Sequence, residues 1–144
     1  MSARRGFWHL TIVLSLLIQP SAAWPQKRQV PAPQRTFTIF FGWNSATIPS
    51  RYKDVVAQAA MNAKNLMDLR GWVEVRGYVD TSMSEQKSGT LSENMAKAVC
   101  DELIRDGVDP NRVTYSGQGK TQLLKQTPDG VREPINRRVE IRIQ

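Results

Sequence analysis

A strand, a polar loop and a helix in direct succession between residues 73 and 99 most strongly constrain the fold. Alternating apolar residues in VEVRGYVD predict a strand, SMSEQKSGT predicts a loop, and LSENMAKAV has the spacing of an amphipathic helix. This order places Asp80 at the end of the strand and Met95 fifteen residues later, on the helix.

Strands and helices alternate along the rest of the folded part of the chain. Apolar periodicity predicts these elements over residues 37–41, 49–70, 73–79, 84–106, 113–115 and 139–143. The alternation predicts an α/β fold of the βαβαβ(β) type, a two-layer sandwich with two helices on one face of a mixed sheet. The other face is expected to be more solvated, including the side of the second strand that carries Glu74, Arg76 and Tyr78.

The N-terminal segment has the pattern of a secretory signal peptide. Two arginines precede the apolar run 10–18, and small residues lead up to Ala23, so cleavage is expected after Ala23. The alternative, an uncleaved membrane anchor, is disfavoured because a spanning helix needs roughly 20 apolar residues. Trp24 stands at the new N-terminus instead of a lipid-attachment cysteine. We therefore expect residues 1–23 to direct export.

The segment that follows the cleavage site is proline-rich and polar. Residues 24–35 contain three prolines among glutamine, lysine and arginine, a composition that predicts a disordered linker. The folded domain is expected to cover residues 36–144.

Composition excludes several function classes. The only histidine, His9, lies in the predicted signal peptide, and the only cysteine, Cys100, falls on an apolar helix position. The mature chain is therefore expected to have no disulfide, metal cluster, histidine-based triad or cofactor, and we predict that it is not an enzyme. The formal net charge is +7, but the basic residues are dispersed, which argues against nucleic-acid binding.

Further motifs identify a family. Besides the strand, loop and helix over residues 73–99, the chain carries FFGWNS at 40–45, GVDPNRV at 107–113, GQG at 117–119 and DGVREPINRRVEI at 129–141. In this order they resemble the OmpA-like C-terminal domain, a peptidoglycan-associated family, over roughly residues 36–144. The last motif is the most specific, because a long polar loop leads into Asn-Arg-Arg-Val-Glu-Ile.

The resemblance implies a ligand and a site. Members of this family hold the peptide stem of peptidoglycan without covalent bonds by gripping diaminopimelate, whose free end carries an ammonium and a carboxylate. An aspartate receives the ammonium, and an arginine holds the carboxylate through two parallel hydrogen bonds. Asp80 matches the family aspartate, and Asn136 and Arg137 match an Asn-Arg pair near the pocket. The alternative for Asp80 is a loop residue that caps the next helix.

The ligand loop departs from the family pattern. Met95 stands where the family has its carboxylate-binding arginine, and the residues at 78, 79, 83, 87 and 88 also differ from the pattern. Helical spacing favours a Met95 thioether packed at the edge of the core. Lys87 and Arg138 are the candidates for a compensating cation. Their alternatives are a solvated surface lysine and an exposed strand residue paired with Glu140 or Glu74.

Two functions follow. The first is a periplasmic module of a Gram-negative cell, associated with the cell wall or outer membrane, that tethers to peptidoglycan through Asp80, Asn136 and Arg137. The second keeps the fold with a degenerate pocket and acts as an interaction or scaffold domain for another envelope protein. No transmembrane segment is expected in the mature chain.

Overall fold

The computed structural model describes residues 35–67 and 71–144. Its elements are β1 (Arg35–Phe40), η1 (Ser50–Tyr52), α1 (Lys53–Met67), β2 (Val73–Tyr78), α2 (Glu85–Arg105), η2 (Pro110–Arg112), β3 (Val113–Gly117), η3 (Pro134–Asn136) and β4 (Arg138–Ile143). The predicted signal peptide at 1–23 and the predicted linker up to residue 34 lie outside the described residues. Arg35, assigned to the linker from composition, instead begins β1 and pairs with Ile143.

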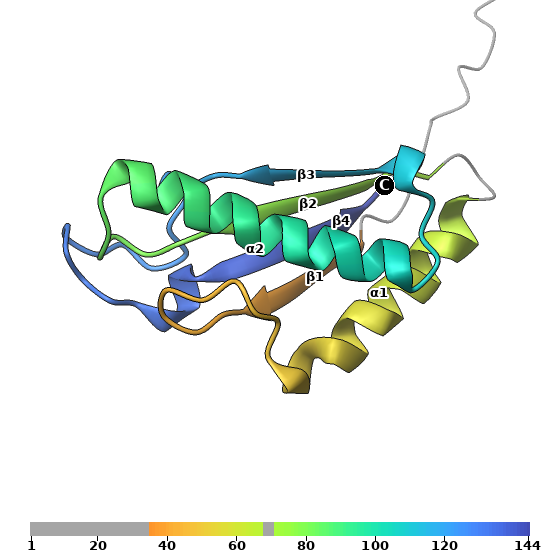
Figure 1. Cartoon of the computed structure of the whole chain (residues 1–144), viewed down its shortest axis with the longest axis horizontal. Coiled ribbons are helices and arrows are strands. Elements are labelled where there is room, and N and C mark those ends of the chain that lie inside the picture. Colours follow the sequence, from red (N-terminus) through yellow and green to blue (C-terminus); the bar gives the residue numbers. More distant parts are fainter. Residues whose placement is uncertain (1–34, 68–70) are drawn as a thin grey trace, which may run out of the picture. The chain divides into compact units, whose positions relative to one another are not determined.

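The four strands form one mixed sheet, which confirms the predicted fold class. Its order is β1-β4-β2-β3. Strand β4 is antiparallel to both β1 and β2, and β2 is parallel to β3. Both helices lie against one face of this sheet (Figure 1). The last strand in the sequence is therefore an inner strand of the sheet.

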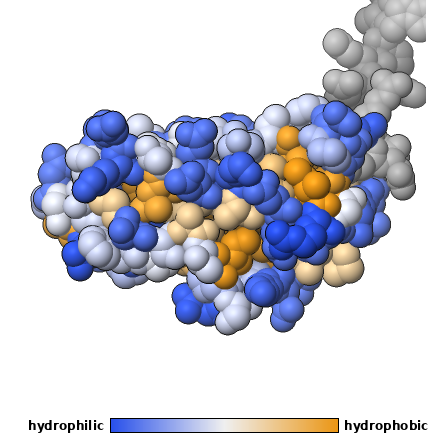
Figure 2. All heavy atoms as spheres, in the orientation of Figure 1, coloured by the Kyte–Doolittle hydropathy of each residue, from blue (hydrophilic) through white to orange (hydrophobic). Residues whose placement is uncertain are grey.

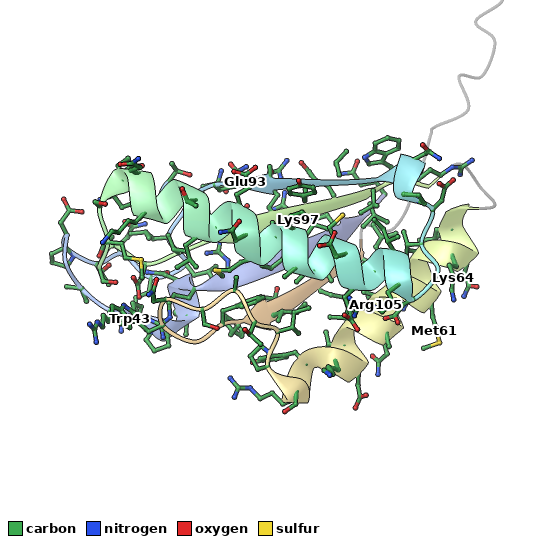
Figure 3. The ribbon with its side chains drawn as sticks, viewed as in Figure 1. Trp43, Met61, Lys64, Glu93, Lys97 and Arg105 are labelled. Atoms are coloured by element: carbon green, nitrogen blue, oxygen red, sulfur yellow. The ribbon has the colours of Figure 1, made fainter. Side chains whose placement is uncertain are left out.

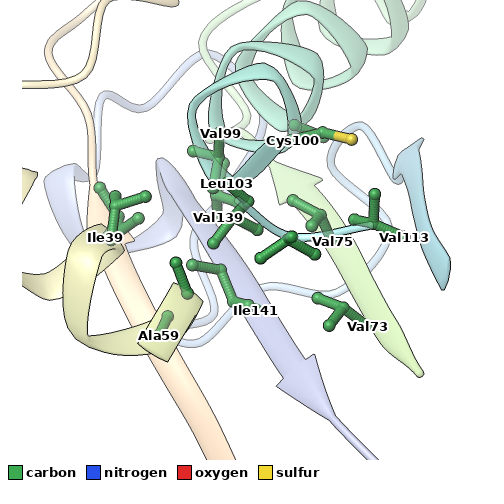
Figure 4. Close-up of a cluster of buried hydrophobic side chains, with 14 of the residues drawn as sticks. Ile39, Ala59, Val73, Val75, Val99, Cys100, Leu103, Val113, Val139 and Ile141 are labelled. Carbon is green, nitrogen blue, oxygen red and sulfur yellow. The ribbon is translucent and has the colours of Figure 1, made fainter. Parts of the chain in front are cut away.

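The register places the apolar residues of the strands in rows that face the helices. One row joins Phe37, Ile141, Val75 and Tyr115 across all four strands. Helices α1 and α2 cover these rows, and the cluster includes Val99 and Leu103 of α2 and Ala59 of α1 (Figure 4). The core contains small and branched side chains for the most part, so the helices lie close to the sheet.

Two glycines let α2 approach β2 and β3 especially closely. A Cβ atom on Gly77 would lie 2.0 Å from the Ser92 carbonyl oxygen, and one on Gly117 would lie 2.5 Å from the Glu93 nitrogen. The Ser92 hydroxyl donates to the Gly89 carbonyl at 2.9 Å and accepts from the Gly119 N–H at 2.9 Å. This contact fixes the first half of α2 beside the end of β2, where Asp80 follows.

The sheet face opposite the helices is only partly solvated, which corrects one expectation. Tyr78 and Arg138 were both expected at a water-facing surface, but both are buried. The Arg138 guanidinium lies 4.0 Å from the Tyr78 ring centroid and donates to the Gln122 carbonyl at 3.1 Å. The loop 118–136 therefore folds back over this end of the sheet and covers both side chains.

Candidate ligand-binding site

Asp80 lies just beyond the end of β2 and is completely buried, at 0% exposure. Its Oδ1 atom accepts from the Ser82 N–H at 3.1 Å and from the Ser82 hydroxyl at 2.5 Å. Its Oδ2 atom accepts from the Glu133 N–H at 3.1 Å and from the Arg137 guanidinium at 2.6 Å. The carboxylate thus holds together two loops, and it does not cap α2, whose N-cap is Ser84.

Arg137 extends this cluster to the first strand. Its Nε atom is 3.4 Å from the Phe41 carbonyl, to which it donates, and its own carbonyl accepts from the Phe41 N–H at 2.8 Å. Arg137 is 7% exposed, so the Asp80–Arg137 ion pair is almost fully screened from water. Loops that follow β1 and β2 and precede β4 meet at this pair.

The pKa of Asp80 is set by opposing effects. Burial alone raises it, but the hydrogen bonds from Ser82 and Arg137 outweigh burial and lower the pKa of Asp80 below its ordinary value. Asp80 is therefore an ionised carboxylate at neutral pH. Removing either charge of such a pair leaves the other buried without a partner.

Asn136 is buried beside Arg137 in the sequence, but its side chain is bound elsewhere. Its amide oxygen accepts from the Lys125 N–H at 2.9 Å, and its amide nitrogen donates to the Lys125 carbonyl at 2.8 Å. The side chain thus bonds both backbone groups of Lys125, as a neighbouring strand would, and holds the loop 118–136 in place. The structure brings two of the three predicted site residues together, Asp80 and Arg137, while Asn136 acts on the loop.

Met95 is buried in the core at 0% exposure. The sequence predicted a thioether at the edge of the core, and the structure places it within the main apolar cluster. Position 95, where the resemblance would place the family arginine, is therefore part of the apolar core in this chain.

Two adjoining hollows lie between the loop after β1, the loop after β2 and the first half of α2. The larger, about 530 Å³, is lined by Asn44, Gln86, Lys87, Thr90, Leu91 and Asn94. The smaller, about 240 Å³, is lined by Trp43, Asn44, Ser82, Met83, Ser84 and Lys87. Asn44 and Lys87 line both, so the two hollows are parts of one groove, which we call the α2 groove.

The compensating cations predicted from sequence lie in different environments. Lys87 lines both parts of the α2 groove. Arg138 lines neither: it is 3% exposed, and its guanidinium is bound to Glu140 at 2.9 Å. The predicted partner Glu140 is therefore correct for Arg138, but the predicted exposure is wrong.

Trp43 links the groove to the buried pair. Its indole N–H donates to the Ser82 hydroxyl at 3.2 Å, and that hydroxyl donates to Asp80. The Arg132 guanidinium lies 3.7 Å from the Trp43 ring centroid on the outside (Figure 3 labels Trp43 at this end of the domain). Asp80 is therefore hydrogen-bonded to a residue, Ser82, that lines the smaller hollow.

Sequence reasoning treated the FFGWNS stretch as a family landmark and missed its part in the groove. One signal was available in the sequence, because Trp43 is a large aromatic residue in a polar loop. In the structure it is 46% exposed. Asn44 has a φ of 49°, in the left-handed region where asparagine is enriched among non-glycine residues.

No group of three metal-ligating side chains occurs within residues 35–67 and 71–144. Cys100 is buried there, and burial raises the pKa of its thiol, with Asp101 adding to the rise.

No helix in this part of the chain is both long and apolar enough to span a membrane. The surface seen over the helices is largely hydrophilic, with apolar side chains in separate areas (Figure 2).

Comparison with known proteins agrees with this architecture. The model of the OmpA family matches residues 40–137, which include the Asp80–Arg137 pair and the whole α2 groove. The chain belongs to the OmpA family.

Two curated relatives illustrate the OmpA relationship. An outer membrane protein of Gluconacetobacter diazotrophicus is 38% identical over 117 residues, which cover 77% of this chain and 30% of the relative. Outer membrane protein A of Bordetella avium is 30% identical over 123 residues, which cover 82% of this chain and 62% of the relative. The chain thus spans less than two thirds of the length of these relatives.

Two solved structures share the fold. The C-terminal domain of Helicobacter pylori MotB has a TM-score of 0.66 and 26% identity, and the match covers 76% of this chain and 84% of that one. The peptidoglycan-associated lipoprotein from Burkholderia pseudomallei has a TM-score of 0.68 and 20% identity, and the match covers 74% and 89%. The second match concerns the fold alone.

Proposed function

We propose that this chain is a non-covalent peptidoglycan-binding module of the Gram-negative cell envelope, working in the periplasm as a tether to the cell wall. Membership of the OmpA family supports this, as do relatives named as outer membrane proteins and a neighbour of the same fold named as peptidoglycan-associated. Such a module binds and does not catalyse. Export through residues 1–23 is part of the same proposal.

The proposed ligand is the diaminopimelate-bearing stem peptide, held in the α2 groove. The observation that carries this is an ionised aspartate, Asp80, that is hydrogen-bonded to Ser82, a residue lining the smaller hollow. An ammonium that enters there can take the place of the Ser82 hydroxyl on Oδ1 and gain a charge-assisted hydrogen bond.

The three residues predicted from sequence then have different roles. Asp80 supplies the negative charge. Arg137 holds the carboxylate in place through Oδ2, which leaves Oδ1 for exchange. Asn136 keeps the loop 118–136 closed through Lys125. Of these three residues, only Asp80 contacts the ligand in this proposal, and Arg137 and Asn136 are positioning residues.

A specific pair of observations favours the scaffold alternative. Asp80 already accepts four hydrogen bonds from the chain itself, and Met95 offers nothing to a carboxylate. In that case the groove holds no stem peptide, and the module serves an envelope protein as an interaction domain.

Co-sedimentation of the full chain with purified cell-wall sacculi separates these functions. We expect the wild-type chain to sediment and Ser84→Trp, which fills the smaller hollow from an exposed position, to lose most of the binding. Glu93→Trp, at an exposed α2 position outside the groove, is the control for an added tryptophan.

Two further variants decide the mechanism. Asp80→Asn should abolish sedimentation while circular dichroism shows that the fold is kept. Binding that survives both Asp80→Asn and Ser84→Trp would exclude the groove as the site. Absence of wild-type binding, with a gain in Met95→Arg, would establish the degenerate pocket and the scaffold function.

A further inference from the structure

Among the described residues that line the α2 groove, one side chain is charged, and this charge is positive. Apart from Lys87, the lining consists of amide, hydroxyl and apolar side chains. No aspartate or glutamate lines either hollow, because Asp80 lies behind Ser82. A ligand in the groove therefore meets an exposed cation first.

The Lys87 ammonium is not engaged by the chain itself. It makes no ion pair or hydrogen bond with any residue in the described ranges, whereas Lys97 on the same helix is 2.7 Å from Asp101. Glu85, the acidic residue in the first turn of α2, is 3.5 Å from Lys120 and does not line the groove. The positive charge of Lys87 is therefore available for an anion.

The face of α2 explains why this lysine and not residue 95 points to the groove. Lys87, Leu91 and Asn94 are four and seven residues apart, so they share one face of the helix, and all three line the larger hollow. Met95 belongs to the neighbouring buried face. The backbone position of Lys87 is thus about 12 Å nearer the start of α2 than that of residue 95, at 1.5 Å per residue.

We propose that Lys87 binds the free carboxylate of the stem peptide in this chain and makes the groove selective for that carboxylate over its carboxamide. This inference rests on the proposed function and adds the specificity of the same site. Lysine offers a single point charge at an exposed position, where arginine would grip with two hydrogen bonds. The selectivity is therefore modest, about fivefold, which corresponds to ~1 kcal/mol.

Isothermal titration of the full chain tests this with two soluble peptides. Both are L-Ala-γ-D-Glu-diaminopimelate, and they differ only in whether the side-chain end of diaminopimelate carries a carboxylate or a carboxamide. We expect the wild type to bind the carboxylate form about fivefold more tightly and Lys87→Gln to bind both forms equally. Lys97→Gln, which removes the same charge from α2 outside the groove, should keep the preference.

Each other outcome overturns the inference. Equal binding of both peptides by the wild type, or a preference that survives Lys87→Gln, rejects Lys87 as the selective residue while sacculus binding stands. A preference lost in Arg132→Gln instead would assign it to the cation stacked on Trp43. If the wild type binds neither the peptides nor sacculi, the proposed function fails as well.

Discussion

The two ends of the domain are held together by different forces. Around Val99, Leu103 and Ile141, the helices and the sheet share an apolar core whose stability comes from buried area and close packing. At the end of β2, the loops are held by the ionised pair Asp80 and Arg137 with its hydrogen bonds. The core tolerates changes of shape better than the pair tolerates loss of a partner, because a buried charge without a partner is costly.

Met95 belongs to the first of these regions. It is part of the apolar cluster, although the resemblance to the family places a charged residue there. In this chain, position 95 therefore belongs to the apolar core. Among the described residues, Arg137 supplies the positive charge that is paired with Asp80.

The largest expected effect concerns the buried pair. Asp80→Asn removes the negative charge and leaves Arg137 buried, so we expect the free energy of unfolding to fall by about 3–5 kcal/mol. Urea unfolding of the full chain measures this. In the double variant Asp80→Asn with Arg137→Met, part of the loss should be regained. A double variant that is less stable than the sum of the single ones would show that the charge is not what holds this end.

The next effect is the dependence of that loss on pH. The pKa of Asp80 is lowered in the folded state, so its ionised form stabilises the fold above its unfolded pKa of about 4. This contribution is lost as pH falls through the folded pKa. We expect the stability difference between wild type and Asp80→Asn to be full at pH 6 and to shrink progressively below about pH 5.

Leu103→Ala is the control from the apolar core. Leu103 is fully buried, and its truncation should cost about 2–5 kcal/mol at every pH, because no ionisable group is removed. The pKa of Glu140 is also lowered, since hydrogen bonds from Arg142 and Arg138 outweigh its burial. All variants that keep Glu140 therefore lose the same stabilisation at low pH, so this loss cancels when the variants are compared. A deficit of Asp80→Asn that stays constant down to pH 3 would contradict the assignment.

The smallest expected effect is at Met95. Met95→Leu conserves volume in the apolar cluster, so the free energy of unfolding should change by no more than about 1.5 kcal/mol. Sacculus binding should be unchanged, because a core residue contributes no contact to the ligand. Loss of binding with stability intact would show that the Met95 thioether faces the groove.

The elements of the fold were predictable because each one has a local signal. Alternation in Val139, Ile141 and Ile143 located β4, and the apolar spacing from Leu91 to Leu103 located α2. The water-facing side of β2 was predicted incorrectly at Tyr78, since the loop that covers it lies more than forty residues later in the sequence. Local periodicity carries no information on a distant loop that folds back over a sheet.

The site was predictable in part for the same reason. The alternation of residues 73–79 correctly placed Asp80 at the end of a strand, and the position of Met95 on a helical stripe correctly indicated the core. The role of Asp80 in holding a ligand stays a prediction. The partners of Asp80 were not predictable from spacing, because Arg137 is 57 residues away and joins it only through the sheet order. The α2 groove escaped prediction because its walls come from the loop after β1 as well as from α2.

The inner position of β4 has a consequence for the order of folding. Strand β2, helix α2 and strand β3 are consecutive and pack on one another, so Asp80, Lys87 and Met95 belong to one continuous stretch of the chain. Arg137 arrives only with β4, the strand that joins β1 to the rest of the sheet. We therefore expect Asp80 to acquire its guanidinium partner in the final step, when the last strand closes the sheet.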